Sequence, residues 1–391
     1  MRRRPSEAPG LVAVDASWTQ LGVSGVGRTL LELLPRLAER TPLVALVDAR
    51  RPVPDLGPQV EVQPVGVAPG LPRLAWLELG VAPWLARHRD VLLHGAAYAL
   101  PLRVRAPAVV TLYDVAWETH PRDFSPWKRQ AWRLSARRSV ATAGAVLTVS
   151  DFSRQAIVAS YGLDPATVLV APCAAGAAFT SGPRSPSTGP SLPDRYVVAL
   201  GGAARRDLPL AVEVWRRARA ALRSGGAPPR VALRSGEAAP RAVRSGDAPP
   251  EVGLVVVGTE QPPQEPGITW LRRVEDPAWA SVLAGAEAFL YPTSHEGFGL
   301  PAAEACACGT PVVCARVGSL PEVLGDAAAW APHLDAGSLA STLAQLLADP
   351  RRRAALSAAS LARRAQAPTW DDAADTTVRA YDLARHRWAA R

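Results

Sequence analysis

Two glutamates, Glu296 and Glu304, lie eight positions apart in the stretch EGFGLPAAE, with two glycines and a proline at fixed places between them. Gly297 and Gly299 let the backbone approach a ligand closely and adopt φ values that other residues avoid. Pro301 fits the first position of a helix, where its missing N–H costs nothing. The remaining N–H groups of that turn and the helix dipole favour an anion such as a phosphate. The two carboxylates would hold hydroxyl groups on either side of it, a pattern that indicates a nucleotide-sugar.

The elements that must position these glutamates are short apolar runs alternating with helical patterns such as RTLLELLPRLAER. Seven runs in the first half are expected strands: LVAVDAS, LVALVDA, VEVQPV, VLLHGA, VVTLYDV, AVLTVS and VLVAPC. Five follow in the second half: YVVALG, LVVVG, ITWLRRV, AFLYPT and PVVCAR. The alternation is typical of parallel sheets with crossover helices, and 391 residues suit two cores better than one.

The segment SGPRSPSTGPSLPD, around residues 181–194, is rich in Pro, Ser and Gly and predicts a linker between two domains. We therefore expect domains at 1–182 and 183–368, followed by a final helix at 369–391. Residues 223–250 contain the degenerate repeat RSGGAPPR, RSGEAAPR and RSGDAPPE. Such a segment has no apolar periodicity with which to bury surface, so we expect a disordered insertion without a role of its own.

The glutamate stretch resembles the E-x(7)-E signature of the retaining glycosyltransferases of family 4, which have the GT-B fold. The resemblance covers nearly the whole chain. In the first half it includes GVGRTLLELLPRL, VVTLYDVAW, HPRDFS and VLTVSDFSRQAI. In the second half it includes YVVALG, RRDLPLAVEVW, LVVVG, GTPVVCARVGSLPEV and GDAAAW. It implies two Rossmann-like α/β domains facing a cleft, with a C-terminal helix that crosses back to the first domain.

The resemblance also implies roles for the residues of the signature. Glu304 looks like the residue that binds the ribose diol, and Glu296 resembles the one that faces the transferred sugar. The backbone of Phe298, Gly299 and Leu300, next to Gly297, would contact the sugar and the diphosphate. Base recognition in the family runs largely through the backbone, here around three further positions: Gly258, Arg273 and Val274.

Two further groups would contact the diphosphate. Gly25 and Gly27 open a helix after the strand LVAVDAS, and the resemblance implies that this turn faces the diphosphate from the other domain. A G-x-G after a strand is by itself usually only a tight turn. Arg205 and Arg206 follow YVVALG, where family members usually carry Arg-Lys. Charge-assisted bonds from arginine can neutralise the leaving diphosphate. We find no D-x-D pair and expect no metal and no cofactor.

Three residues of the first domain are expected to line the substrate pocket. Tyr113 and Asp114 end the strand VVTLYDV, where the family normally shows His-Asp beside the donor sugar. A phenol cannot copy the geometry of an imidazole, which puts the sugar identity and the activity in question. His94 in VLLHGA is a candidate for the pocket wall or, equally, a histidine at the edge of the core.

Composition limits the partners and the compartment. The net charge is +9, and Lys128 is the only lysine, so anionic partners are favoured. Aromatic residues are not interleaved with the arginines, which argues against nucleic acid. No apolar run is long enough to span a membrane or to form a signal-peptide core, and four cysteines make no disulfide framework. We expect a cytoplasmic protein.

The segment PWKRQAWRLSARRSV, residues 126–140, predicts a basic helix with a possible place at a membrane. Arg129, Arg133 and Arg137 recur every four residues and would form one basic stripe, with Trp127 at its end. Basic amphipathic helices bind anionic lipid surfaces. The alternative is an ordinary solvated helix whose tryptophans pack inward.

The resulting interpretation is a retaining, metal-independent hexosyltransferase. It would move a sugar from a nucleotide-sugar, with GDP-mannose favoured, to a hydroxyl of a glycan, a glycolipid or a polysaccharide precursor. The alternatives are a UDP-sugar donor, a GT-B epimerase or phosphorylase, and a non-catalytic protein that binds sugar nucleotides. A phosphorylase or epimerase would need a cofactor lysine or extra acids, and Lys128 lies on a surface-like helix.

Overall fold

The structure is a computed structural model that describes residues 10–21, 24–88, 90–181, 192–202, 204–224, 251–272 and 274–390. It divides into two compact units. Unit 1 comprises Met1–Ala174 together with Pro368–Arg391, and unit 2 comprises Ala175–Ala367. Most of the expected linker and nearly all of the repeat segment lie outside the described residues.

Unit 1 contains a seven-stranded parallel sheet with the order β3-β2-β1-β4-β5-β6-β7. Its strands are β1 (Val12–Asp15), β2 (Leu43–Asp48), β3 (Glu61–Val65), β4 (Leu92–Gly95), β5 (Ala108–Thr111), β6 (Ala145–Thr148) and β7 (Val168–Val170). Its helices are α1 (Gly25–Ala38), α2 (Arg73–Trp76), α3 (Ala82–Arg87), α4 (Ala116–Thr119), α5 (Pro126–Thr142), α6 (Asp151–Tyr161) and α13 (Trp370–Ala389). All seven strands predicted for the first half are confirmed.

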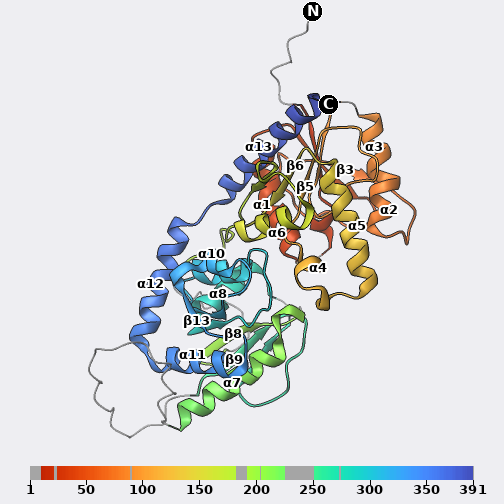
Figure 1. The fold of residues 1–391 in the computed structure, drawn as a ribbon. Helices are drawn as coiled ribbons and strands as arrows, with labels where there is room; N and C mark the ends of the chain where they lie inside the picture. The colour runs from red at the N-terminus through yellow and green to blue at the C-terminus, as the bar shows by residue number, and fades with distance from the viewer. Residues whose placement is uncertain are drawn as a thin grey trace, which may run out of the picture. The chain divides into compact units, whose positions relative to one another are not determined.

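Unit 2 contains a six-stranded parallel sheet with the order β10-β9-β8-β11-β12-β13. Its strands are β8 (Tyr196–Leu200), β9 (Gly253–Val257), β10 (Ile268–Leu271), β11 (Ala288–Leu290), β12 (Val312–Ala315) and β13 (Ala328–Ala331). Its helices are α7 (Leu208–Arg223), α8 (Asp276–Gly285), α9 (Leu300–Ala307), α10 (Leu320–Leu324), α11 (Ala336–Ala348) and α12 (Pro350–Gln366). The five strands predicted for the second half are all present, and β13 is a sixth that was not predicted. Figure 1 shows α7 beside α11.

The central strands are buried on both faces, which explains why they are continuous apolar runs. Along β8, Tyr196 and Val198 pack into one hydrophobic cluster, whereas Val197 and Ala199 pack into another. Successive side chains of a strand point to opposite faces, so the two clusters are the cores above and below the sheet. The expectation of two Rossmann-like α/β domains is confirmed.

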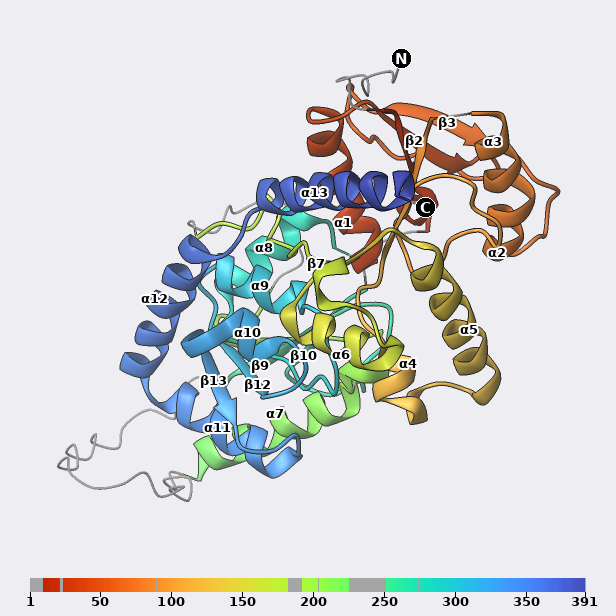
Figure 2. The ribbon, with the colours of Figure 1, turned by 45° about the horizontal axis from the view of Figure 1, so that its top comes forward.

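The C-terminal helix α13 packs on unit 1, against α1 and the strands β5, β6 and β7 (Figures 1 and 2). Gly144 lets it approach closely, since a Cβ there would lie 2.7 Å from the Cα of Ala384. Arg40, two residues after the end of α1, bonds to Asp375 at 2.6 Å and to Asp371 at 2.7 Å. The C-terminal helix predicted to return to the first domain is therefore confirmed.

His94 of β4 fixes α13 from the inside of unit 1. Its Nδ1 lies 2.9 Å from the hydroxyl of Tyr381, and its Nε2 lies 2.8 Å from Oγ1 of Thr111. Burial lowers the pKa of His94 to about 3, so the imidazole is neutral at physiological pH. Both ring nitrogens of His94 form hydrogen bonds within unit 1, so this residue behaves as a histidine of the core.

We expect His94 to make unit 1 sensitive to acid. The histidine of an unfolded chain has a pKa of about 6.5, so between about pH 3 and that value the unfolded state binds the extra proton. Stability therefore falls as the pH falls through this window, by up to about 1.4 kcal/mol per pH unit for this site. Chemical unfolding of the wild type and His94→Gln from pH 7 to pH 4 should show a steeper loss in the wild type. Parallel curves would contradict the assignment.

Candidate functional site

The strand order of unit 2 places a switch point between β8 and β11. From β8 the chain proceeds to β9 and β10 on one side, whereas β11, β12 and β13 follow on the other. In open parallel sheets, ligands bind outside the carboxyl ends of the strands at such a point. Arg205 and Arg206 follow β8, and Glu296 lies in the loop after β11.

The carboxylate of Glu296 is buried and surrounded by donors. Its side chain is 7% exposed. Arg205 donates from Nε to Oε1 at 3.2 Å and from Nη2 to Oε2 at 3.4 Å, and Nε of Arg206 lies 4.0 Å from Oε1. The hydroxyls of Tyr291 and Thr293 also donate to Oε1. Two cations and two hydroxyls stabilise a charged carboxylate in this position.

Tyr291 is a donor that keeps its proton. It immediately follows β11 and is fully buried, with its ring stacked on Phe289 at 4.9 Å between centroids. Burial and then the charge of Glu296 raise the pKa of Tyr291 well above its usual value. The phenol therefore orients the carboxylate by hydrogen bonding. Neither Tyr291 nor Thr293 was predicted as a site residue, although both stand in the run AFLYPT.

The backbone of Glu296 is held by the loop after β12. Ser319 donates from its amide and from its hydroxyl to the carbonyl oxygen of Glu296, each at 3.1 Å. Gly318 adopts φ +55°, and a Cβ there would lie 2.4 Å from the same oxygen. Only glycine allows this approach. Gly318 stands in the run GTPVVCARVGSLPEV, but no local sequence pattern indicates that it contacts Glu296.

Arg205 and Arg206 are fixed by a short turn at the end of β8. The carbonyl oxygen of Arg205 accepts from the amide of Ser294 at 2.8 Å, which joins the turn to the loop of Glu296. Asp207 then caps α7 with a hydrogen bond from the amide of Leu210 to Oδ1 at 3.0 Å, in a left-handed conformation of φ +38°. Among the described side chains, Nε of Arg206 is a buried donor with no hydrogen-bond partner.

The glycine loop before α9 differs in detail from the expectation. Gly299 adopts φ +90° and Pro301 occupies the first turn of α9. The amides of Ala302 and Ala303 donate to the carbonyl oxygen of Gly299, at 2.9 and 3.1 Å. Two donors of the expected helix-terminal anion site are thus used within the helix. The backbone of Phe298, Gly299 and Leu300 stays the predicted contact with the diphosphate.

Glu304 lies in the second turn of α9, not in the first, because the helix begins at Leu300. Glu304 is 1% exposed, and its Oε2 accepts a hydrogen bond from the indole of Trp279 at 2.8 Å. Trp279 comes from α8 and packs edge-on against Phe289, 6.1 Å away between centroids. The sequence analysis did not single out this tryptophan.

Gly258 and Val274 lie at the carboxyl ends of β9 and β10. Gly258 adopts φ +142°, and a Cβ there would lie 2.3 Å from the carbonyl oxygen of Gly201. Its own carbonyl oxygen accepts from the indole of Trp270 at 2.9 Å. Val274 packs against the core of unit 2. Arg273 lies outside the described residues, so the predicted contacts with the base stay predictions.

The glycine turn of unit 1 opens α1 beside the switch point between β1 and β4. Gly25 is the first residue of the helix, and Ser24 caps it by accepting from the amide of Gly27 at 3.0 Å. Neither Gly25 nor Gly27 has a positive φ. Their backbone conformation does not require glycine. Their contact with a ligand stays a prediction.

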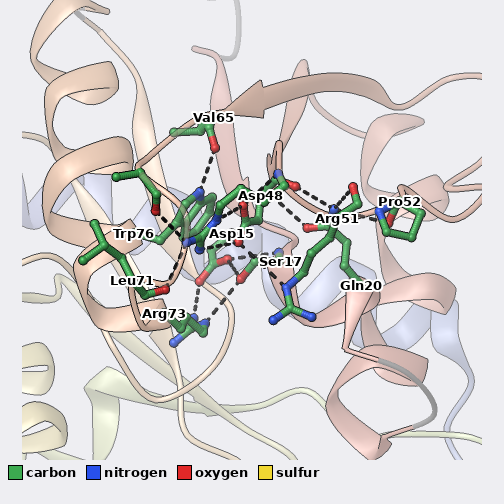
Figure 3. A network of polar contacts seen from close by, with 12 residues as sticks. Asp15, Ser17, Gln20, Asp48, Arg51, Pro52, Val65, Leu71, Arg73 and Trp76 are labelled. Carbon is green, nitrogen blue, oxygen red and sulfur yellow. Dashed lines mark hydrogen bonds and ion pairs between the residues drawn. The ribbon is translucent and has the colours of Figure 1, made fainter.

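A buried polar network holds the short helix Ser17–Gln20, which follows β1 (Figure 3). Asp15 is fully buried at the end of β1 and forms an ion pair with Arg73 of α2. The other carboxylate oxygen of Asp15 accepts from the amide and the hydroxyl of Ser17, at 3.1 and 2.6 Å. Gln20 donates to the carbonyl oxygen of Asp48 at 3.0 Å and accepts from its amide at 2.8 Å. The short helix Ser17–Gln20 is therefore held at both ends.

Tyr113 and Asp114 follow β5. The carbonyl oxygen of Tyr113 accepts from Ser153 of α6 at 3.0 Å, and its ring packs edge-on against Tyr98 at 5.8 Å. Burial raises the pKa of Tyr113 well above its usual value. Asp114 accepts from the amide of Ala116 at 3.1 Å, which begins α4.

The described part of the chain contains no group of three or more His, Cys, Asp or Glu side chains that could hold a metal ion. Cys306 and Cys308 of the C-x-C pair are buried, and burial raises their pKa to about 11 and about 12. These thiols therefore stay protonated at physiological pH and behave as small buried apolar side chains.

Both halves of the chain match families of glycosyltransferases. Residues 23–175 match the model of Glycosyltransferase Family 4, and residues 236–349 match that of Glycosyl transferases group 1. The chain is 31% identical over 313 residues to O-antigen chain mannosyltransferase B of Escherichia coli, covering 77% of this chain and 76% of the relative. This chain belongs to the group 1 glycosyltransferases of family 4.

Further comparisons agree. The chain is 31% identical over 325 residues to the D-inositol 3-phosphate glycosyltransferase of Actinosynnema mirum, covering 79% of this chain and 71% of the relative. Among solved structures, sucrose-phosphate synthase from Thermosynechococcus elongatus matches 98% of this chain and 100% of that chain, with a TM-score of 0.72 and 17% identity. The fold is thus the GT-B fold of glycosyltransferases, as the resemblance implied.

We expect Trp279→Phe to weaken nucleotide binding by this glycosyltransferase. The substitution keeps an aromatic ring in the core but removes the indole donor from the buried carboxylate of Glu304. A hydrogen bond to a charged group contributes about 1.5–3 kcal/mol, so the dissociation constant should rise at least tenfold. Calorimetric titration with the cognate nucleoside diphosphate tests this expectation. Trp330→Phe, which loses the bond from its indole to the carbonyl oxygen of Gly325 at 3.0 Å in unit 2, is the control and should bind as the wild type does.

Proposed function

We propose that this glycosyltransferase moves a hexose from a nucleotide-sugar to an acceptor hydroxyl, with retention at the anomeric carbon. The observation that carries the proposal is the buried carboxylate of Glu296 beside Arg205 and Arg206 at the switch point of unit 2. The acceptor is a hydroxyl of a glycan, a glycolipid or a polysaccharide precursor. GDP-mannose is the favoured donor, because one relative is named as an O-antigen chain mannosyltransferase.

In this mechanism the arginines stabilise the departing diphosphate. Negative charge on the leaving group is greatest in the transition state, so donors that are already in place lower the barrier. Arg206 suits this role because its buried Nε is attracted by Glu296 but is not hydrogen bonded to it. The reaction then needs neither a metal nor another cofactor. The first turn of α1, with Gly25 and Gly27, is proposed as a second contact with the diphosphate.

Glu296 and Glu304 bind different parts of the nucleotide-sugar donor. Glu304, oriented by Trp279, binds the ribose diol. Glu296, oriented by Tyr291 and Arg205, faces the transferred sugar. The acceptor attacks the anomeric carbon from the face that the diphosphate leaves, and the leaving phosphate takes the proton of the acceptor. Catalysis is then mainly positioning and electrostatic stabilisation.

We also propose that α5 contacts an anionic membrane surface, but through a different face from the one that the sequence predicts. Arg129 donates to the carbonyl oxygen of Trp117 at 3.0 Å, and Arg133 pairs with Glu118 at 2.9 Å. Both arginines therefore turn toward α4, and the predicted stripe of Arg129, Arg133 and Arg137 is wrong as an outward face.

The exposed face of α5 carries Trp127 and Leu134, which are 83% and 56% exposed. Lys128, Arg137 and Arg138 are exposed beside them, and α5 contains no acidic residue. Apolar side chains flanked by cations suit the interface of an anionic bilayer. None of the helices in the described ranges is long and apolar enough to cross a bilayer, so the proposed contact is peripheral.

We expect the two glutamates to give different defects. Glu304→Ala should weaken binding of the free nucleotide at least tenfold, because a charged acceptor contributes about 1.5–3 kcal/mol per bond. Glu296→Ala should abolish turnover and leave nucleotide affinity nearly intact. The donor is first identified by thermal shift with UDP, GDP, ADP and their sugars, and calorimetry then compares the variants. Equal losses of nucleotide affinity would refute the division of roles, and loss of activity in EDTA would refute metal independence.

We expect the protein to sediment with anionic liposomes at low salt and to be released by high salt. Each cation near such a surface contributes about 1 kcal/mol, so Lys128→Gln/Arg137→Gln/Arg138→Gln should lower the partition coefficient roughly a hundredfold. Trp127→Ser should lower it as well. Arg216→Gln/Arg217→Gln on α7 is the matched control and should sediment as the wild type does. Protein that stays in the supernatant with anionic vesicles would refute membrane contact.

A further inference from the structure

Asp207 joins the arginines of the proposed diphosphate site to helix α7, and its backbone conformation is unusual. It adopts φ +38° and ψ 69°, in the left-handed region. Among the described residues, three that are not glycine have a positive φ, and Asp207 is the one that belongs to unit 2. Aspartate tolerates this conformation better than most residues do, but the conformation still costs free energy. It persists only where the surroundings impose it.

Capping of α7 does not explain this conformation. The carboxylate of Asp207 accepts from the amide of Leu210 at 3.0 Å, and its carbonyl oxygen accepts from the amide of Ala211 at 3.0 Å. Asp335 caps α11 and Asp349 caps α12 by the same kind of carboxylate bond, at 2.8 and 3.0 Å. Their φ values are −140° and −118°, in the extended region that is usual for a capping residue. A capping aspartate of unit 2 therefore does not need a left-handed backbone.

The chain is anchored on both sides of Asp207. On one side, the carbonyl oxygen of Arg205 accepts from the amide of Ser294 at 2.8 Å and from its hydroxyl at 3.4 Å. On the other side, Leu208 begins α7 and is 3% exposed, within a hydrophobic cluster on one face of the sheet. The first anchor holds the chain at the loop after β11, and the second holds it in the core. Arg206 and Asp207 must connect the two anchors, and the left-handed turn at Asp207 makes that connection.

Arg206 depends on this turn for the direction of its side chain. Its Nε is buried, lies 4.0 Å from Oε1 of Glu296, and has no hydrogen-bond partner within the described ranges. A hydrogen bond requires a shorter distance, so Glu296 attracts this donor without fixing it. The backbone of Arg206 is held by its two neighbours instead. The direction in which its guanidinium points is therefore set where the chain turns, at Asp207.

We propose that Asp207 is a positioning residue, whose left-handed backbone holds Arg205 and Arg206 at the diphosphate of the donor. The carboxylate caps α7, whereas the backbone conformation aims the arginines. The proposal rests on the proposed function, because that function gives the arginines their contact with the diphosphate. A small displacement of a group that acts on the transition state lowers the rate strongly. The reaction therefore slows when residue 207 leaves the left-handed region, even if α7 stays folded.

The test uses variants of Asp207 that separate its backbone from its carboxylate. Asp207→Asn keeps the left-handed backbone and the cap, and should retain most of the activity. Asp207→Gly keeps the backbone without the carboxylate, and its kcat should stay within about threefold of the wild type. Asp207→Val loses both, because a β-branched residue avoids positive φ, and its kcat should fall roughly ten- to a hundredfold. Turnover is measured as release of GDP from GDP-mannose, with water as the acceptor.

Asp335→Val is the matched control. Asp335 also caps a helix of unit 2 with its carboxylate, but its backbone is extended. Losing a cap should lower the melting temperature of both valine variants by about 2–4 °C, whereas only Asp207→Val should lower kcat. In Asp207→Val the affinity for GDP should change less than kcat does, because the charge on the leaving group is greatest in the transition state. Asp207→Val should cause little further loss in a protein that already carries Arg206→Ala, since both changes remove the same contact.

Amide hydrogen exchange gives a readout that needs no turnover. The amide of Ser294 should exchange faster in Asp207→Val, because its bond to the carbonyl oxygen of Arg205 depends on the turn. It should exchange as in the wild type in Asp207→Asn and in Asp335→Val. If Asp207→Val does not fold, Asp207→Ala is the milder replacement, and the same directions of change are expected.

Three results would overturn the positioning role of Asp207. The first is an unchanged kcat in Asp207→Val. The second is an equal loss in Asp207→Gly and Asp207→Val, which would assign the effect to the carboxylate. The third is a fully additive loss in combination with Arg206→Ala. If the wild type releases no nucleoside diphosphate from GDP-mannose, UDP-glucose or ADP-glucose, the proposed function fails, whereas the exchange of the Ser294 amide still decides whether Asp207 sets the turn.

Discussion

A charged carboxylate removed from water is the constraint on which the switch point of unit 2 depends. Burying an unpaired charge is expensive, and removing one partner of a buried pair costs about 3–5 kcal/mol. Glu296 is therefore surrounded by Arg205, Arg206 and Tyr291. These partners come from the ends of two neighbouring strands, so the need to neutralise one side chain joins the loops that follow β8 and β11. The backbone of the same residue is held separately, because Gly318 lets Ser319 reach the carbonyl oxygen of Glu296.

Unit 1 meets the same constraint with a different set of residues. Asp15 is fully buried at the end of β1, and it is neutralised by Arg73, which lies 58 positions later in the chain. The guanidinium of Arg73 also lies over the ring of Trp18, 5.2 Å from its centroid. Such a pair contributes little net stability, since desolvation offsets the attraction. Its effect is geometric, because it permits one arrangement of the short helix Ser17–Gln20.

Much of this structure could be predicted from local sequence. Strands buried on both faces are continuous apolar runs, and twelve of them were found in that way. Strand β13 was missed because its sequence is AAWA, and alanine has a low preference for strands. The glycines and the proline around Glu296 were informative because each satisfies a backbone requirement that other residues do not meet. The final helix was predictable from its own pattern, and Thr369 and Asp372 cap it reciprocally.

The partners of the functional side chains were not predictable in the same way. The indole of Trp279 meets Glu304 across 25 positions, and Arg205 meets Glu296 across 91. No periodicity relates residues so far apart, since their contact depends on which strands become neighbours. The prediction of an outward basic stripe on α5 was wrong for a related reason. Helical spacing places Arg129 and Arg133 on one face, but only the position of α4 shows that both side chains bond to residues of that helix.

Helix α13 links these local constraints to the chain as a whole. It follows α12 of unit 2 but belongs to unit 1, so the chain passes between the units at Ala367 and Pro368. Arg40, just after the end of α1, bonds to α13, and Tyr381 of α13 bonds to His94 of β4. Near the start of α1, Thr29 lies 3.5 Å from Sγ of Cys173, and near the end of α1, Arg36 pairs with Asp371 of α13 at 3.6 Å. Both ends of α1 depend on buried or partly buried polar contacts, which have narrow distance requirements. Such contacts give α1 one defined position in unit 1, whereas apolar packing alone would tolerate several.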